Sequence, residues 1–190
     1  MKFLKALIGI LFSPAYFYRK LYGQVYGSGE WFVLYGLPVI VAGAAGRMVR
    51  VLNRAAVEQG ELLMAWQMLV VFIISLVAYT ISVWIGGHLL SKLSGAFGGR
   101  EDSNAGVILC MTAYTPFMIS QLLGAINPFM NPVIFLGIAY TLFLFSRGTG
   151  YMLGTPEGRT TGFTLIAFFI IFGLSHLVIF LISNMFAFGG

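Results

Sequence analysis

The segment from Thr112 to Pro116 concentrates polar residues inside an otherwise apolar run. Pro116 has no backbone N–H, so a helix through this segment loses a hydrogen bond and leaves the carbonyl of Thr112 without its usual donor. The hydroxyls of Thr112 and Thr115 are close enough in sequence to help satisfy it. We therefore expect either a polar, bent centre around Tyr114 that binds a ligand or acts as a hinge, or a packed structural kink.

His176 and Gln121 extend this set of candidates. His176 falls near the middle of the last apolar stretch, and ionisable groups at such a depth often belong to functional sites. The alternative is a neutral imidazole bonded to a backbone carbonyl or to a hydroxyl such as that of Ser175 or Thr112. A water-filled path would instead indicate a small transporter or channel, with a lining of Gln67, Thr112, Tyr114, Gln121 and His176.

Three arginines are candidates for contacting lipid headgroups. Arg47 and Arg50 are three residues apart near the end of the first apolar stretch, so they share one face of a helix. Arg147 follows the fourth apolar stretch. Guanidinium groups at such positions either extend into the surrounding headgroup layer or bind one particular phosphate. Both alternatives make membrane lipids the expected partners of these side chains.

The sequence carries no signature of an enzyme, a metal site or a cofactor site. Its single aspartate, Asp102, falls in a charged segment, which leaves no plausible Ser–His–Asp set. His88 and His176 have no cysteine or acidic companions at metal-ligand spacing. The glycine-rich stretch 95–99 lacks the Gly-Lys-Ser/Thr ending of a phosphate-binding loop. We therefore expect a non-enzymatic protein without a cofactor.

The composition assigns the chain to the polytopic helical membrane proteins. Of its 190 residues, 59% are hydrophobic and 9% are charged, whereas about a quarter of a soluble domain is usually charged. So few charges cannot cover a water-facing surface. The net charge of +5 comes from basic residues between apolar stretches, which argues for membrane orientation signals rather than nucleic-acid binding. The single cysteine, Cys110, cannot form an internal disulfide.

Five apolar stretches predict five membrane-spanning helices in an all-α fold. The predicted spans are residues 31–52, 62–90, 105–126, 132–145 and 163–188. The third and fourth spans lie in one uncharged run and need a turn between them. Asparagine favours turns and proline ends helices, so we predict a tight hairpin at Asn127, Pro128, Asn131 and Pro132.

The first 30 residues are predicted to form an amphipathic segment on the membrane surface, followed by a five-span domain over residues 31–190. Apolar residues recur at helical spacing in the first helix, and Ser13-Pro14 predicts the start of a second helix that ends near Gly23. With the amino terminus inside, the inner side holds 8 of the 11 basic residues and the outer side holds 3. The positive-inside rule then predicts a cytoplasmic amino terminus and a periplasmic carboxyl terminus.

Several short segments resemble the YIP domain family, membrane proteins that interact with Rab GTPases, and especially its bacterial branch. In order along the chain they are FSP at 12–14, LP at 37–38, AYTPF at 113–117, LLG at 122–124, NP at 127–128, IAYTLFL at 138–144 and GYMLGTPE at 150–157. The resemblance covers nearly the whole chain, and five spans agree with it. It implies an integral membrane protein, here of a bacterial inner membrane.

The resemblance also implies a function without catalytic residues. Eukaryotic members bind small GTPases and other membrane proteins and help to shape or sort membranes. Their acidic Leu-Tyr-Gly-Pro element is absent from this chain, which argues against a small GTPase as partner. The expected function is a membrane scaffold that binds other membrane proteins, binds copies of itself or organises lipid. Transport and phospholipid binding are the alternatives.

Overall fold

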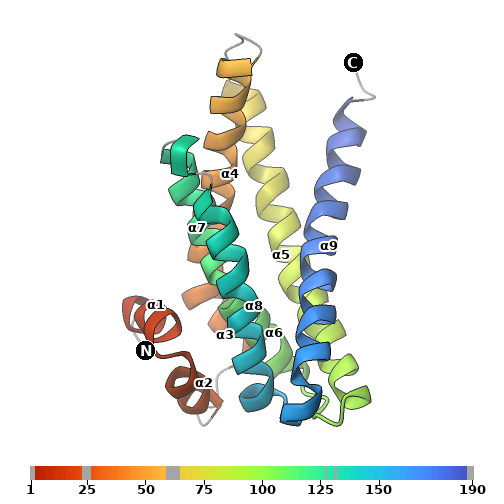
Figure 1. Cartoon of the computed structure of the whole chain (residues 1–190). Helices are drawn as coiled ribbons and strands as arrows, with labels where there is room; N and C mark the ends of the chain where they lie inside the picture. Colours follow the sequence, from red (N-terminus) through yellow and green to blue (C-terminus); the bar gives the residue numbers. More distant parts are fainter. Residues whose placement is uncertain (1–2, 23–26, 59–64, 127, 131, 188–190) are drawn as a thin grey trace.

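The computed structural model describes residues 3–22, 27–58, 65–126, 128–130 and 132–187, and every element within these ranges is helical. The chain begins with two short helices, α1 (Phe3–Phe12) and α2 (Pro14–Tyr22). Five longer helical segments then run side by side along the molecule (Figure 1). Each is long and apolar enough to cross a membrane, which confirms the predicted all-α fold with five spans.

Short elements interrupt or connect several of the spans. The first span is a continuous helical segment of α3 (Ser28–Trp31), the π-helical turn η1 (Phe32–Gly36) and α4 (Leu37–Glu58). The second span is α5 (Ala65–Ala96). The third is divided into α6 (Ser103–Ala113) and α7 (Thr115–Ile126). The 3-10 turn η2 (Pro128–Met130) follows, and the last two spans are α8 (Pro132–Met152) and α9 (Glu157–Ala187).

The third span is the centre of the bundle. In its most apolar stretch 83% of the residues are buried, against 22% to 39% in the other four spans. α6 packs against α5 and α8, and α7 packs against α4 and α8. The other helices therefore present much of their apolar surface to the surroundings, as expected for a protein surrounded by lipid.

Glycine allows two of these helix pairs to approach closely. A Cβ atom on Gly46 of α4 would lie 2.5 Å from the backbone carbonyl carbon of Gln121 in α7. A Cβ atom on Gly87 of α5 would lie 2.5 Å from the Cα atom of Val107 in α6. Such contacts are shorter than carbon atoms tolerate, so a larger residue would push the backbones apart. Small residues commonly permit this kind of contact between helices in membranes.

The last two helices extend beyond their predicted ends. α8 continues to Met152 rather than stopping near Phe145, and α9 begins at Glu157 rather than at Phe163. The prediction was wrong because apolar composition marks the hydrocarbon layer, whereas a helical backbone keeps its internal hydrogen bonds beyond that layer. The connection is set instead by Gly154, whose φ of +66° suits glycine, and by Pro156 directly before α9.

Three other predicted boundaries also move outward, whereas the end of the third span at Ile126 and the start of the fourth at Pro132 are confirmed. The first span begins at Ser28 rather than Trp31, and the second continues to Ala96 rather than Leu90. The third begins at Ser103, where Asp102 caps it by accepting a hydrogen bond from the backbone N–H of Ala105 at 3.0 Å. The predicted starts and ends at residues 23, 62 and 188 lie outside the described residues.

The predicted hairpin falls partly outside the described residues, because Asn127 and Asn131 are not among them. What is described agrees with a short connection. α7 ends at Ile126, η2 begins at Pro128, and α8 begins at Pro132. The third and fourth spans are therefore adjacent antiparallel helices.

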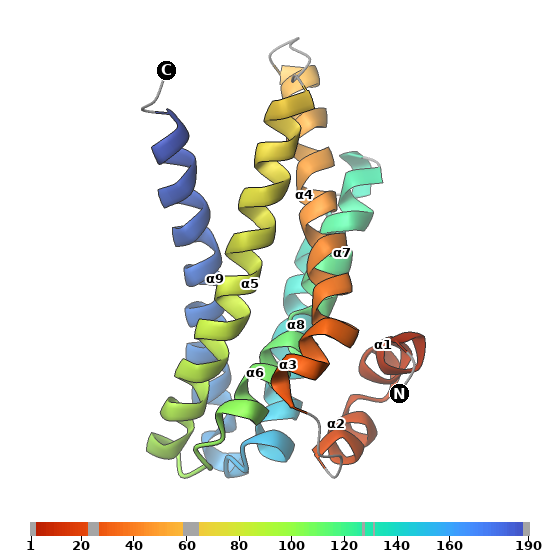
Figure 2. The ribbon, with the colours of Figure 1, turned by 180° about the vertical axis from the view of Figure 1, so that it is seen from behind.

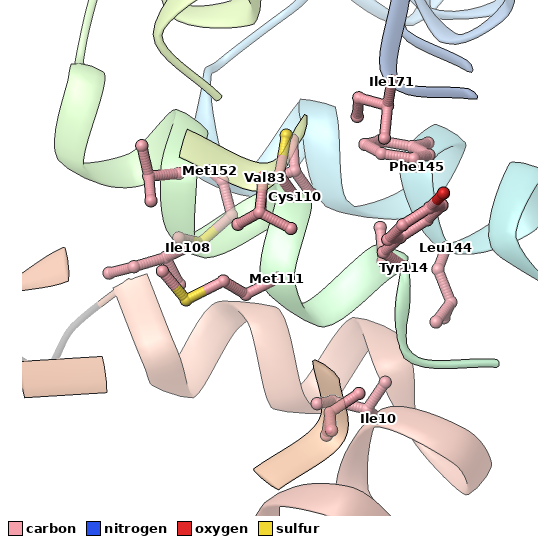
Figure 3. Close-up of a cluster of buried hydrophobic side chains, with 14 of the residues drawn as sticks. Ile10, Val83, Ile108, Cys110, Met111, Tyr114, Leu144, Phe145, Met152 and Ile171 are labelled. Atoms are coloured by element: carbon pink, nitrogen blue, oxygen red, sulfur yellow. The ribbon is translucent and has the colours of Figure 1, made fainter. Parts of the chain in front are cut away.

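The two amino-terminal helices lie beside one end of the bundle, far from the last described turns of α9 (Figures 1 and 2). α2 packs against α8, and Ile10 of α1 is fully buried in the main apolar cluster. Figure 3 shows this cluster, in which Ile10 joins side chains of α5, α6, α8 and α9, including Cys110 and Phe145. α1 and α2 are therefore part of the folded domain.

Candidate functional site

The helical ladder of the third span is interrupted at Tyr114, two residues before Pro116. The Tyr114 hydroxyl lies 2.9 Å from Ser175 Oγ in α9, and Ser175 Oγ donates to Ser82 Oγ in α5 at 2.9 Å. Ser82 in turn donates to the carbonyl of Ala78 at 2.7 Å. The hydroxyls thus form a buried chain of donors that ends on a backbone carbonyl. It connects the interruption to two of the neighbouring spans.

A second hydrogen bond connects the interruption to the first span. Thr115 Oγ1 donates to the carbonyl of Met111 at 3.1 Å, so it accepts a hydrogen bond from the Tyr35 hydroxyl at 2.7 Å. Tyr35 belongs to the π-helical turn η1, and its ring stacks on Trp31 at 5.3 Å. The irregular turn in the first span and the interruption in the third are therefore bonded to each other.

Aromatic rings surround this hydroxyl chain. The ring of Tyr114 lies 5.1 Å from Phe117, 5.2 Å from Phe172 and 6.2 Å from Tyr79. All four side chains are buried. Rings at these separations contribute about 0.5–1.5 kcal/mol per pair beyond the area that they bury. The geometry is that of a packed junction between α5, α6, α7 and α9.

Thr112 extends the junction to the amino-terminal helices. Its hydroxyl lies 2.9 Å from the carbonyl of Ile108 and 3.3 Å from the Tyr18 hydroxyl of α2. Tyr18 is fully buried, and burial raises the pKa of its phenol above the ordinary value. Thr112, Tyr114 and Thr115 thus make contacts in three different directions.

His176 is not brought together with Tyr114. Its side chain is exposed on the outer face of α9, and its Nδ1 lies 2.8 Å from the carbonyl of Phe172 in the same helix. This is the backbone-carbonyl arrangement that we considered as an alternative. The adjacent Ser175 faces the junction instead, since neighbouring helical residues point about 100° apart. Tyr114 and His176, two of the residues predicted to line one path, therefore face different sides of the bundle.

Arg47 and Arg50 point from α4 toward two neighbouring helices. Arg47 Nη1 donates to Ser75 Oγ of α5 at 3.3 Å, and Arg50 Nη1 donates to Gln121 Oε1 of α7 at 2.6 Å. Gln121 is buried. Its hydrogen bond to Arg50 places it with the arginines rather than with Tyr114. Asn53, one turn further along α4, donates to the carbonyl of Ala125 at 3.1 Å.

Arg147 is separate from this pair. It is exposed on α8, and its guanidinium carbon lies 5.5 Å from the ring centroid of Phe143. Within the part of the chain that the structure describes, no group of three or more His, Cys, Asp or Glu side chains could hold a metal ion. Neither the junction nor the arginine pair contains a base beside a nucleophile.

Residues 8–180 match the Yip1 domain, which is more than nine-tenths of the chain. The chain belongs to the Yip1 domain family. The resemblance to YIP domain proteins is thereby confirmed. Comparisons with curated proteins and with solved structures return no match.

Sequence reasoning missed several partners in this Yip1 domain. Tyr18, Tyr35 and Ser82 were not among the predicted site residues, although each bonds to a residue that was or to Ser175. One signal was available, since Ser75 and Ser82 are seven residues apart and so share one face of α5. Both of them face polar side chains of other spans.

Proposed function

We propose that this Yip1 domain protein is a non-enzymatic membrane scaffold that organises lipid in one leaflet of the bilayer. In this proposal α1 and α2 lie in the cytoplasmic leaflet of a bacterial inner membrane, and the carboxyl terminus is periplasmic. The observation that carries the proposal is the apolar face of α1. Leu4, Ile8 and Phe12 are exposed in one row, although α1 is packed firmly against the bundle.

The attachment of α1 supports a role in one leaflet. On the side away from that row, Ala6 and Ile10 are buried. The Tyr140 hydroxyl of α8 donates to the carbonyl of Leu11 at 2.6 Å. The helix is thus held at a fixed depth beside one end of the spans, and it occupies space in one leaflet.

Charge at the same end supports an interfacial position. Lys5, Arg19 and Lys20 are exposed on α1 and α2, where they can contact lipid phosphates. Arg100 donates to the Tyr22 hydroxyl of α2 and lies 4.7 Å from its ring, and its backbone N–H donates to the carbonyl of Leu153 at 2.6 Å. This arginine, in the α5–α6 connection, joins α2 to the connection between α8 and α9.

The exposed row supplies a substantial driving force toward lipid. Removing a Leu, Ile or Phe side chain from water is worth about 1.5–3 kcal/mol, so three of them favour insertion by several kcal/mol. We expect the full-length protein, inserted in one orientation into phosphatidylethanolamine–phosphatidylglycerol vesicles, to enrich on membrane tubes of one sign of curvature. Protease cleavage of exposed loops checks the orientation.

Two triple variants make this test specific. Leu4→Ser, Ile8→Ser and Phe12→Ser together remove the apolar row, and we expect the enrichment to be lost. Leu4→Ile, Ile8→Leu and Phe12→Leu together keep the row apolar, and we expect the enrichment to be retained. Equal enrichment of the serine variant would refute a lipid-organising role for α1.

Photo-crosslinking distinguishes lipid from a protein partner. Phe12 is 80% exposed on α1 and Phe135 is 74% exposed on α8, so both tolerate replacement by benzoylphenylalanine. We expect both positions to form adducts with lipid acyl chains. If position 135 yields lipid adducts while position 12 yields protein adducts alone, α1 is a protein-docking helix and the proposal fails.

A further inference from the structure

The arginine pair lies near the end of the bundle opposite to α1 and α2. α4 ends at Glu58, which places Arg47 about 16 Å and Arg50 about 12 Å before the end of that helix at 1.5 Å per residue. A side chain there would reach bulk headgroups most directly by extending along its own helix. Both arginines instead reach across to α5 and α7.

The positive charges meet neutral acceptors. The two described partners are a serine hydroxyl and a carboxamide oxygen. From residue 65 to residue 156 the sequence contains two acidic residues, Glu101 and Asp102, and both belong to the loop at the other end of the bundle. Helices α5 and α7, which face the arginines, therefore contain no carboxylate that could neutralise them.

The site also has spare hydrogen-bonding capacity. Each guanidinium carries five N–H donors, and the described contacts use one donor of Arg47 and one of Arg50. Two like charges three residues apart on a helix also repel each other. A phosphate group matches such a site, because it brings negative charge and several acceptor oxygens that suit guanidinium forks.

The frame around the pair is rigid. Gly46 packs directly against the backbone of Gln121, and Asn53 bonds to the carbonyl of Ala125. Gln121 is 5% exposed, so the acceptor of Arg50 is held in one place. The donors are therefore oriented before any anion binds, which lowers the cost of binding.

We propose that Arg47 and Arg50, in the frame of α4, α5 and α7, form a binding site for a phosphate group. An anionic phospholipid headgroup and free inorganic phosphate share this chemistry. The site is independent of the lipid-organising role of α1, since it lies at the other end of the spans.

The test uses delipidated full-length protein in detergent and native mass spectrometry. Phosphatidylglycerol is titrated against the wild type, against Arg47→Gln/Arg50→Gln and against the control Lys92→Gln/Arg159→Gln, which removes the same charge from two other exposed positions. We expect affinity to fall at least about tenfold in the first variant, equivalent to 1.4 kcal/mol, and less than about threefold in the control. Equal losses in both variants would show nonspecific attraction and overturn the proposal.

A second variant keeps the proposal testable if the double glutamine variant does not fold. Gln121→Glu has nearly the same shape but supplies an internal carboxylate to Arg50. We expect this variant to be more heat-stable than the wild type in lipid-free detergent and to gain no further stability from phosphatidylglycerol. Lipid stabilisation equal to that of the wild type would contradict the site.

Competition identifies the source of the phosphate. Inorganic phosphate is added to the complex with phosphatidylglycerol. Sodium chloride at equal ionic strength is the control. Specific displacement by phosphate assigns the site to a free anion, and retention of lipid assigns it to a headgroup. If neither lipid nor phosphate binds the wild type, the proposal is wrong, whereas the role of α1 is unaffected.

Discussion

The bond between Tyr114 and Ser175 should respond very differently to the removal of its two partners. In Ser175→Ala the Tyr114 hydroxyl stays buried, and it loses the partner that the described contacts give it. An unpaired buried hydroxyl costs about 1–3 kcal/mol. In Tyr114→Phe, Ser175 still donates to Ser82 or to the carbonyl of Ile171. That variant should lose about 0.5–1 kcal/mol, the usual value for a hydrogen bond between membrane helices.

The double variant sharpens this expectation. Once the Tyr114 hydroxyl is gone, Ser175→Ala leaves no phenol unpaired, and Ser82 still donates to Ala78. Tyr114→Phe should therefore partly rescue Ser175→Ala. The assay is reversible unfolding in mixed micelles of mild detergent and sodium dodecyl sulfate, followed by circular dichroism. Tyr16→Phe is the control, because Tyr16 is exposed.

The order of the free energies of unfolding among these variants tests the reasoning. We expect the wild type and Tyr16→Phe to be equal, followed by Tyr114→Phe, the double variant and Ser175→Ala. If the double variant is less stable than Ser175→Ala, the two side chains act independently. The bond between Tyr114 and Ser175 would then contribute nothing to the stability of the junction.

Two further predictions concern other parts of the fold. Gly46→Ala should lower the free energy of unfolding by about 1–3 kcal/mol, because its Cβ would meet the α7 backbone at 2.5 Å; Gly173→Ala, with no atom within 4 Å of the new Cβ, should be neutral or stabilising in a thermal melt. Burial raises the pKa of Tyr18, so the unfolded chain releases this proton near pH 10 while the folded one retains it. The contribution of Tyr18 to stability is then complete below about pH 10 and falls above it by up to about 1.4 kcal/mol per pH unit. Unfolding titrations of the wild type and Tyr18→Phe should diverge in this direction, and parallel curves would contradict the assignment.

Hydropathy predicted the number of spans because that number depends only on how many long apolar stretches the sequence contains. The helix ends were less accessible, since Gly154 and Pro156 determine them through backbone conformation rather than through polarity. Which span is central was also hidden. Lipid and protein interiors are similarly apolar, so burial leaves only a weak trace in the sequence of a membrane helix.

In the candidate site, too, the sequence predicted some features and not others. The missing backbone N–H of Pro116 predicted an interruption of the third span. The observed interruption is at Tyr114, two residues before this proline. The partners of Tyr114 and Thr115 come from residues 61 and 80 positions away, which no local pattern connects to them. His176 and Ser175 are adjacent, and the rotation of α9 about its axis decides which of them faces inward.

The burial of the third span bears on how the protein is made. This span is less apolar than the second and the fifth, yet it is the most enclosed in the finished bundle. Lipid alone therefore favours its insertion less than it favours theirs. When the ribosome has completed α7, the helices α8 and α9 have not yet been synthesised, and neither has Ser175, which follows Tyr114 by 61 residues. Until α9 enters the membrane, the Tyr114 hydroxyl lacks its bond to Ser175. Insertion of the last helix therefore supplies the final hydrogen-bond partner of the central span.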